Sequence, residues 1–423
     1  MQPSLKGIAK RAKEDKNCKF RSLNREITHV LLNHCFEEMN RKSATGVDEV
    51  DYDEYKENLW TNIRSLLERI KNGSYHASLV RRHYIPKGNG KVRPLGIPIT
   101  EDKLLQRAVR TILEAIYEQD FLPSSFGYRP GRSARDAVDE LQRELNFGGF
   151  NWLVEADIKG FFDNINHEKL VDMLKRRIDD ESFIRLIQKW LRAGVLDTDG
   201  KIIHPETGTP QGGVISPMLA NIYMHHVLNE WFENVVVKHC KGKAYLCVYA
   251  DDFVCAFEKE EDAKKFYNVL PKRLAKFDLE VAPEKTKLIK FSRKESATSE
   301  TFDFLGFEFR WVQSRLKTTY FVKRSTSKKR FMRAIDTIDE WLKKNRSKPI
   351  TVLFKELNRK LVGYYNYYGV PGNYDCLEKY FHIVTLRLRK WLCRRSQRIS
   401  YTWQNFKNLL KAFYLAKPKI RYR

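Results

Sequence analysis

The sequence lacks long apolar runs and any N-terminal segment typical of secretion. No continuous apolar stretch reaches the roughly 20 residues that a membrane-spanning helix requires. The N-terminus, MQPSLKGIAKRAKEDKN, has no apolar core of the kind that a signal peptide carries. These absences predict a cytoplasmic protein that does not associate with membranes.

Closely paired cysteines are also lacking. No two of the seven cysteines form a C-x-x-C pair, and none has zinc-finger spacing, since they stand at positions 18, 35, 240, 247, 255, 376 and 393. A disulfide framework and a cysteine-based zinc module are therefore excluded as organising features. We expect reduced cysteines that serve as core residues.

Acidic residues are scarce in the last quarter of the chain. Residues 317–423 hold 27 Lys and Arg but 6 Asp and Glu, a net charge of +21, whereas the preceding 316 residues hold 51 against 47. The whole chain carries +25 with a pI near 9.6, and 42% of its residues are hydrophobic. This pattern predicts a near-neutral globular body followed by a basic segment that binds a polyanion, and nucleic acid is the first candidate.

Alternation and helical periodicity divide the chain in the same way. Up to about residue 310 the sequence mixes expected strands with expected helices, which indicates an α+β or mixed α/β fold, and from residue 327 the pattern is helical. The expected strands are 79–85, 92–97, 152–158, 244–249, 252–257 and a pair within 302–311. The expected helices include 51–73, 102–119, two within 168–194, 216–234 and 261–277.

The segment from Ala244 to Phe257, AYLCVYADDFVCAF, is the most informative local pattern. Two short apolar runs flank the corner that holds Asp251 and Asp252, which predicts a buried β-hairpin with two carboxylates at its turn. The turn contains no glycine, although primed hairpin turns favour one. Adjacent carboxylates that lose hydration need compensation, and a divalent cation supplies it. The alternative is a solvated Asp-Asp turn on a surface hairpin.

A third carboxylate, Asp157, ends the expected strand at 152–158, and Phe162 follows five residues later. If Asp157 lies beside Asp251 and Asp252, the three acids can hold two metal ions about 3.5–4 Å apart, as phosphoryl transfer requires. Ligation by oxygen alone favours Mg²⁺. The alternative for Asp157 is a residue that caps the next turn.

Two further segments suit phosphate groups. Glycines in 208–213, GTPQGG, allow close approach to a ligand ahead of an expected helix. Lys87 and Arg93 flank a glycine-containing turn between two strands and could grip a triphosphate. Each segment alone also fits an ordinary turn.

The order of these motifs closely resembles the fingers and palm of reverse transcriptases. More narrowly, it resembles the bacterial group II intron-encoded reverse transcriptase/maturase family. The resemblance runs from about residue 30 to the end of the chain. It rests on RRHYIPKGNGKVRPLGIP (81–98), SSFGYRPGRSARDAV (124–138), ADIKGFFDNINH (156–167), GTPQGGVISPMLANIYM (208–224), YADD (249–252), FLGFEF (304–309), LVGYYNYYG (361–369) and RRSQRISYTWQNF (394–406).

The resemblance implies an α+β right-hand polymerase fold with a C-terminal helical thumb, or maturase domain. It implies an N-terminal extension and template-contacting loop in residues 1–60, of which 43–50 form the loop. Fingers and palm would then occupy 61–312, and the basic thumb 313–423.

The resemblance also implies site residues. Asp157, Asp251 and Asp252 would be catalytic and bind two Mg²⁺ ions, for which Mn²⁺ can substitute. Phe162 would be the steric gate against a 2′-hydroxyl. The remaining roles fall on three sets: nucleotide contacts from Lys87, Arg93, Pro210, Gln211, Gly212 and Lys285; a primer grip from Phe304, Leu305 and Gly306; and RNA contacts from Arg394 and Arg395.

The implied function is RNA-directed DNA synthesis together with binding of the parent intron RNA to assist splicing and mobility. The implied partners are an RNA template, intron RNA, a DNA primer or target DNA, and deoxynucleoside triphosphates, with action at the bacterial nucleoid. Glu155 stands where many relatives have Asp. No His-Asn-His motif with paired cysteines follows the basic segment, so we expect target-strand cleavage to be supplied from elsewhere.

Three alternatives stay open from the sequence. One is a host-adapted reverse transcriptase used in phage defence or CRISPR-linked adaptation. Another is an RNA-binding splicing factor with a vestigial polymerase, against which the three carboxylates count. The last is an RNA-dependent RNA polymerase, against which the aromatic residue at position 162 counts.

Overall fold

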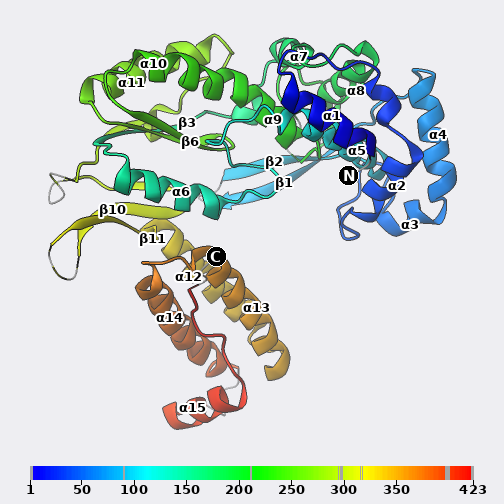
Figure 1. The fold of residues 1–423 in the computed structure, drawn as a ribbon. Coiled ribbons are helices and arrows are strands. Elements are labelled where there is room, and N and C mark those ends of the chain that lie inside the picture. Colours follow the sequence, from blue (N-terminus) through cyan, green and yellow to red (C-terminus); the bar gives the residue numbers. More distant parts are fainter. Residues whose placement is uncertain are drawn as a thin grey trace. The chain divides into compact units, whose positions relative to one another are not determined.

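The computed structural model describes residues 3–88, 91–209, 212–293, 295, 299–314, 316, 318–395 and 401–420. The chain divides into two compact units. Unit 1 comprises residues 1–137 and 154–288, and unit 2 comprises residues 138–153 and 289–423. Strands and helices are mixed through the first three quarters of the chain and helices fill the rest, so the predicted α+β class is confirmed (Figure 1).

Unit 1 begins with four short helices, α1 (Pro3–Glu14), α2 (His29–Glu37), α3 (Tyr52–Glu57) and α4 (Leu59–Lys71). The prediction of one continuous helix over 51–73 is wrong, because the backbone leaves the helical region at Asn58, with φ −117° and ψ 29°. Asp51 starts α3, since its side chain accepts hydrogen bonds from the backbone N–H groups of Asp53 and Glu54.

The central sheet of unit 1 has the strand order β6-β7-β3-β8. β6 (Ala244–Tyr249) and β7 (Asp252–Phe257) form the predicted antiparallel hairpin, and β7 neighbours β3 (Trp152–Asp157), while β8 (Lys287–Lys290) lies at the other edge. Helix α11 (Glu260–Ala275) packs over β7 (Figure 1). Five of the six residues of β7 are buried, as the apolar runs predicted.

A second sheet of unit 1 has the order β2-β1-β4-β5. β1 (Val80–Gly88) and β2 (Lys91–Ile97) form the predicted basic hairpin. β1 also pairs with β4 (Val195–Leu196), which in turn pairs with β5 (Ile202–Ile203). The remaining helices of this unit are α5 (Thr100–Tyr117), α7 (His167–Lys175), α8 (Glu181–Leu191), α9 (Ser216–Met224) and α10 (Val237–His239), with 3-10 turns at Leu23–Glu26, Phe161–Asp163 and Pro283–Lys285.

The predicted helix over 216–234 is only partly α-helical. After α9 the chain widens into two π-helical segments, η3 (His225–Asn229) and η4 (Phe232–Val236), which α10 follows. In η3 the backbone N–H of Glu230 donates to the carbonyl of His225, which is the five-residue spacing of a π-turn.

Unit 2 combines a three-stranded sheet with a helical bundle. The sheet order is β11-β10-β9, and the sequence analysis missed β11 (Tyr320–Thr326) beside β9 (Phe302–Phe304) and β10 (Phe307–Gln313). The helix α6 (Ala134–Phe147), most of which belongs to this unit, is also absent from the predictions. Its Gln142 and Asn146 bond the backbone of Val322 in β11.

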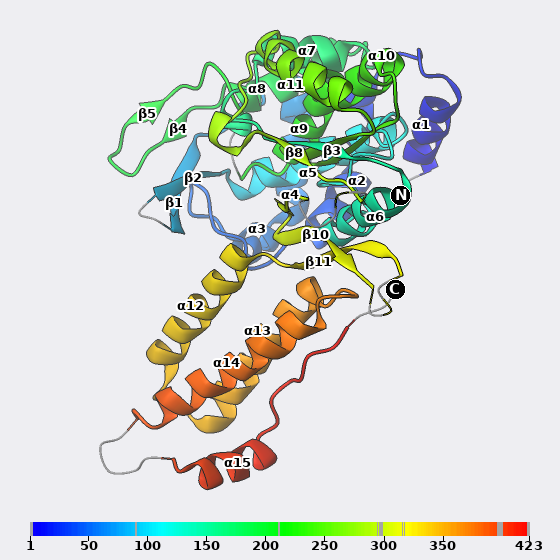
Figure 2. The ribbon, with the colours of Figure 1, turned by 90° about the vertical axis from the view of Figure 1, so that its left-hand side faces the viewer.

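The basic tail is helical, as predicted. Figures 1 and 2 show α12 (Lys328–Asn345), α13 (Ile350–Tyr368) and α14 (Tyr374–Leu392) as a bundle, followed by α15 (Trp403–Ala412). Its apolar core includes Leu342, Leu357, Leu361, Leu377 and Leu388, all fully buried. The predicted interruption at 369–372 is the loop between α13 and α14. Within the described ranges, we find no helix with the length and apolarity needed to cross a lipid bilayer.

Candidate active site

The turn of the β6–β7 hairpin holds the acidic corner. Tyr249 pairs with Asp252, which leaves Ala250 and Asp251 as a two-residue turn. Ala250 takes φ +59°, a left-handed conformation that costs a non-glycine residue about 1–2 kcal/mol. The missing glycine at this corner is therefore replaced by an alanine whose backbone conformation the neighbouring structure must enforce.

A segment elsewhere in unit 1 packs closely against this turn. The segment 124–126 pairs with β6, because Phe126 N–H donates to Val248 O at 2.9 Å and Val248 N–H donates to Ser124 O at 2.8 Å. The next residue, Gly127, lies so close to the turn that an added Cβ would be 2.4 Å from the Ala250 nitrogen. The buried Asn221 of α9 fixes Gly127, since its Nδ2 donates to the Gly127 carbonyl at 2.8 Å.

Asp157, Asp251 and Asp252 come from adjacent strands of one sheet. Burial raises the pKa of Asp251, and the Asp157 charge raises it further. Among the described residues, the only group of three His, Cys, Asp or Glu side chains whose ligand atoms all lie within 4.8 Å of one another is elsewhere, so at least one pair of these three carboxylates lies farther apart than that. Asp157 at the end of β3 and Asp251 beside the start of β7 are close enough for their charges to interact, and these like charges oppose closer approach.

Lys285 provides a cation at this cluster. Its ammonium Nζ forms an ion pair with Asp157 Oδ2, and the hydrogen bond to Asp157 raises the pKa of Lys285. The adjoining backbone is tied to the end of β3, because Ala282 N–H donates to Asp157 O at 2.8 Å and Lys159 N–H donates to Glu280 O at 2.9 Å. The direct partner of Lys285, a residue expected to contact the nucleotide, is therefore a carboxylate in this structure.

Arg93 on β2 also faces the cluster. Its charge counteracts the raised pKa of Asp251. The same charge acts on Tyr128, whose pKa is raised by burial and by the Asp251 carboxylate. The side chain of Lys87 and the whole of Pro210 and Gln211 lie outside the described residues.

Phe162 is buried, with 6% of its surface exposed. Its ring lies edge-on to Tyr128 at 6.3 Å between centroids. Its backbone is held by the glycine-rich segment, because Thr209 N–H donates to Phe162 O at 2.8 Å. Gly208 permits this approach, since a Cβ there would be 2.9 Å from Phe162 O. Gly212 likewise lies against β2, where a Cβ would be 2.6 Å from Gly96 O.

The loop at 43–50 is anchored at the N-terminal end of α5. The buried Lys103 donates to Ser43 Oγ at 3.2 Å and to the carbonyl of Ala44. Thr100 Oγ1 donates to Val50 O at 2.7 Å. A Cβ on Gly46 would be 2.5 Å from Ile99 Cα, so this glycine is needed for the loop to reach α5. The loop predicted to contact the template is therefore held on a rigid element.

In unit 2, the FLGF motif forms a tight turn between β9 and β10. Phe304 pairs with Phe307, and the two turn residues both have positive φ, +49° at Leu305 and +82° at Gly306. The Leu305 carbonyl accepts a 2.8 Å hydrogen bond from Tyr367 Oη. This bond ties the turn predicted to grip the primer to helix α13.

The tyrosines of α13 divide between two environments. Tyr364 stacks on Tyr380 at 3.9 Å between ring centroids, and Tyr365 is 4% exposed in the bundle core. Tyr367 is 41% exposed and its ring stacks on Phe307. Of these residues, Tyr367 therefore offers the most ring surface to a nucleobase.

The two arginines predicted to bind RNA have different surroundings. Arg394 is exposed, with its guanidinium 5.4 Å from the Trp391 ring centroid. Arg395 donates to the Lys348 carbonyl at 2.8 Å, which links the segment after α14 to the loop between α12 and α13. Arg394 is the better residue for testing RNA contact without disturbing the fold.

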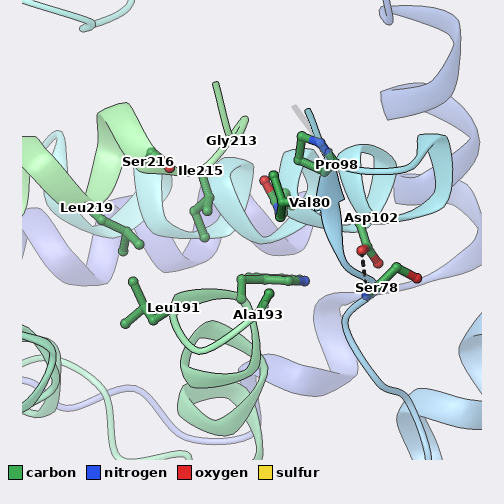
Figure 3. Close-up of a pocket in the computed structure, with 12 residues that line it drawn as sticks. Ser78, Val80, Pro98, Asp102, Leu191, Ala193, Gly213, Ile215, Ser216 and Leu219 are labelled. Carbon is green, nitrogen blue, oxygen red and sulfur yellow. Dashed lines mark hydrogen bonds between the residues drawn. The ribbon is translucent and has the colours of Figure 1, made fainter. Parts of the chain in front are cut away.

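A small enclosed cavity lies in unit 1 near the glycine-rich segment. It measures about 10 Å³, and Ser78, Val80, Asp102, Gly213 and Leu219 are among its lining residues (Figure 3). Asp102 is 2% exposed and accepts hydrogen bonds from Ser78 N–H at 3.0 Å and from Tyr75 Oη at 2.6 Å. A space of this size holds at most one water molecule and is too small to bind a substrate.

The donor set of the carboxylate cluster fits divalent ions that prefer oxygen. Asp252 is exposed at the start of β7, Asp157 is largely buried, and Asp251 has a raised pKa that a cation would lower.

Sequence reasoning missed Gly127 and Asn221. Gly127 lies within the quoted SSFGYRP segment, but its contact joins segments more than 100 residues apart, which no local pattern reveals.

Comparison with known proteins gives two consecutive family matches. The family described as reverse transcriptase (RNA-dependent DNA polymerase) matches residues 85–309. The family described as group II intron, maturase-specific domain, matches residues 310–410.

Individual relatives match shorter stretches. The chain is 48% identical over 166 residues to the group II intron-encoded protein LtrA of Lactococcus lactis subsp. cremoris, covering 39% of this chain and 27% of that protein. It is 38% identical over 202 residues to the protein YkfC of Escherichia coli K12, covering 47% and 52%. It is 43% identical over 173 residues to an uncharacterized 91 kDa protein in the cob intron of Schizosaccharomyces pombe, covering 41% and 21%. The matched part thus spans about half or less of each relative.

Proposed function

Because the chain belongs to the reverse transcriptase family and continues into a group II intron maturase-specific domain, we propose that it is an RNA-directed DNA polymerase of a group II intron. The observation that carries this proposal is the carboxylate cluster of Asp157, Asp251 and Asp252 with Lys285 and Arg93 beside it. A vestigial site would have no need to keep these acids, the strained turn that presents Asp251, and the two cations that face them.

We propose a right-hand polymerase arrangement, with fingers and palm in residues 61–312 and a thumb in residues 313–423. Two Mg²⁺ ions, for which Mn²⁺ can substitute, would lower the pKa of a primer 3′-hydroxyl and neutralise charge on the incoming triphosphate. Asp157, Asp251 and Asp252 would hold the ions. Arg93, with Lys87, would bind the triphosphate, and Lys285 would leave Asp157 and stay close to the departing pyrophosphate. Pro210, Gln211 and Gly212 would line the nucleotide pocket.

The proposed partners are an RNA template, a DNA primer or target DNA, deoxynucleoside triphosphates and the parent intron RNA, at the bacterial nucleoid. The tail of net charge +21 supplies the polyanion contact. A host-adapted reverse transcriptase in defence or CRISPR-linked adaptation would share the polymerase chemistry. The match of residues 310–410 to the maturase-specific domain favours the intron role.

Replacing Phe162 by alanine is expected to raise ribonucleotide incorporation relative to deoxyribonucleotide incorporation. The ring is buried beside Tyr128 and its backbone is fixed by Thr209, so it forms a stable wall where a 2′-hydroxyl would need space. The measurement is the ratio of kcat/KM values for the two nucleotides on the same primer–template. An unchanged ratio in a folded variant would place the sugar selection elsewhere.

Reversing one charge of the tail, Arg394→Glu, is expected to weaken intron RNA binding and to flatten its dependence on salt. Each neutralised phosphate contributes a slope of roughly −0.7 to −0.9 in log K against log salt. The loss of one contact should therefore reduce the slope by about one unit. Filter binding across a salt series measures both quantities.

The control for this prediction is Asp251→Asn, which should leave RNA affinity, salt slope and splicing at low Mg²⁺ intact while it stops cDNA synthesis. If Arg394→Glu binds the intron RNA as the wild type does, RNA contact lies on another face of the tail.

A further inference from the structure

A second group of ligating side chains lies in unit 1 on the π-helical segment η3. His225, His226 and Glu230 bring one ligand atom each within 4.8 Å of one another. The π-turn accounts for the proximity of these ligand atoms. His225 and Glu230 are five residues apart, which is one turn of a π-helix, while His226 and Glu230 are four residues apart. In a regular α-helix, His225 and Glu230 would diverge around the helix.

The distances suit a small metal ion. His225 Nε2 lies 3.5 Å from Glu230 Oε1, and His226 Nδ1 lies 2.7 Å from Glu230 Oε2. Tetrahedral Zn²⁺ with bonds of about 2.0–2.2 Å places its ligand atoms roughly 3.3–3.5 Å apart. The first pair already has this separation, and the second reaches it when the shared proton leaves and the pair opens by about 0.6 Å.

Both imidazoles are short of hydrogen-bonding partners. His225 is 4% exposed and His226 is 8% exposed, yet His225 Nδ1 and His226 Nε2 have no hydrogen-bonding partner among the residues that the structure describes. Through the remaining nitrogen, His225 contacts Glu230, and His226 contacts Glu230 and Arg176.

Arg176 and Arg273 are the cations around this group. Arg176 Nη1 is 3.3 Å from His226 Nδ1 and 3.6 Å from Glu230 Oε2, so its charge lies beside the ligand atoms and opposes a cation there. Arg273 points at the backbone instead, since it donates to the carbonyls of His226 and Val227 at 2.9 Å each. Phe121 packs edge-on to His225 and contributes no charge.

We propose that His225, His226 and Glu230 form a binding site for one Zn²⁺ ion, separate from the carboxylate cluster, with water as the fourth ligand. Nitrogen ligands suit Zn²⁺ and not Mg²⁺, so the ion used for polymerisation does not compete. On binding, neutral His226 coordinates the metal through Nδ1 and carries its single proton on Nε2 instead of sharing it with Glu230. The ion would fix the π-turn that follows α9, the helix that carries Asn221.

The test uses the untagged full chain, equilibrated with Zn²⁺ and then freed of unbound metal. Wild type should retain one Zn²⁺ per chain and gain thermal stability from it, whereas Glu230→Gln and His225→Gln should lose both. The matched control is His34→Gln, an exposed histidine that also pairs with a glutamate four residues away and should behave as wild type. Co²⁺ substitution should give a spectrum without a thiolate charge-transfer band, which excludes the seven cysteines as ligands.

A second variant keeps the proposal testable if the others fold poorly. Arg176→Gln removes a cation from the metal side of His226, so it should tighten Zn²⁺ binding roughly tenfold. Equal Zn²⁺ retention in folded Glu230→Gln, no retention by wild type, or unchanged affinity in Arg176→Gln would each overturn the proposal.

Discussion

Replacing Asp252 by asparagine is expected to reduce primer extension on poly(rA)/oligo(dT) by on the order of 10³-fold or more. Asparagine keeps the size of the side chain but removes the negative charge that holds a divalent ion. Asp252 is exposed at the first position of β7, so the exchange leaves the sheet intact. RNA affinity should change little, because the tail supplies +21 of the chain's net charge of +25.

The matched control is Asp199→Asn, an exposed aspartate in a turn of the same unit whose charge partner is Lys201. It should extend primers as the wild type does. If Asp252→Asn retained near-normal extension in Mg²⁺, the carboxylate would not be a metal ligand and the cluster would need another interpretation.

Replacing Gly127 by alanine is expected to lower kcat by about 10²-fold while the chain remains folded. The new Cβ would meet the Ala250 nitrogen at 2.4 Å and the Ala250 Cα at 3.1 Å, so the two backbones must separate by about 1 Å to restore van der Waals contact. Because Ala250 precedes Asp251 in the turn, the shift moves a carboxylate of the cluster. A displacement of this size typically costs about two orders of magnitude in rate.

Gly7→Ala is the matched control for this prediction. Gly7 lies exposed in α1 with nothing within 4 Å of an added Cβ, so alanine there should leave kcat unchanged and stabilise the helix by up to about 1 kcal/mol. The measurements are steady-state primer extension and thermal unfolding of both variants. Full activity in Gly127→Ala would show that the turn tolerates the displacement.

The hairpin and its acids could be predicted from sequence because their signal is local. The apolar runs on both sides of Asp251 and Asp252 fix the two strands and their register, and the same reasoning places Asp157 at a strand end. The helical tail followed from its apolar periodicity. Failures occurred where local patterns mislead, as at Asn58, where an amphipathic pattern runs across a helix break, and at β11, which the sequence analysis did not predict as a strand.

The supporting contacts could not be predicted because they join distant segments. Nothing near Gly127 shows that it lies against Ala250, or that Asn221 donates to its carbonyl. The same limit applies to Lys285, whose ion pair with Asp157 spans 128 residues. His225 and Glu230 are close in sequence, but their proximity could not be predicted either, because it depends on the π-turn and not on a regular α-helix. Strands and acids follow from residue patterns, whereas the geometry that aligns the acids depends on tertiary packing.

The most direct measurement of the central claim is RNA-templated primer extension by the purified wild-type chain. It uses poly(rA)/oligo(dT) and deoxythymidine triphosphate, first with divalent ions removed by a chelator and then with Mg²⁺ restored. The carboxylate cluster predicts no extension in the chelated reaction and full extension once Mg²⁺ returns. A folded chain that binds the primer–template but adds no nucleotide in Mg²⁺ or Mn²⁺, or one that extends equally well in the chelated reaction, would contradict the account.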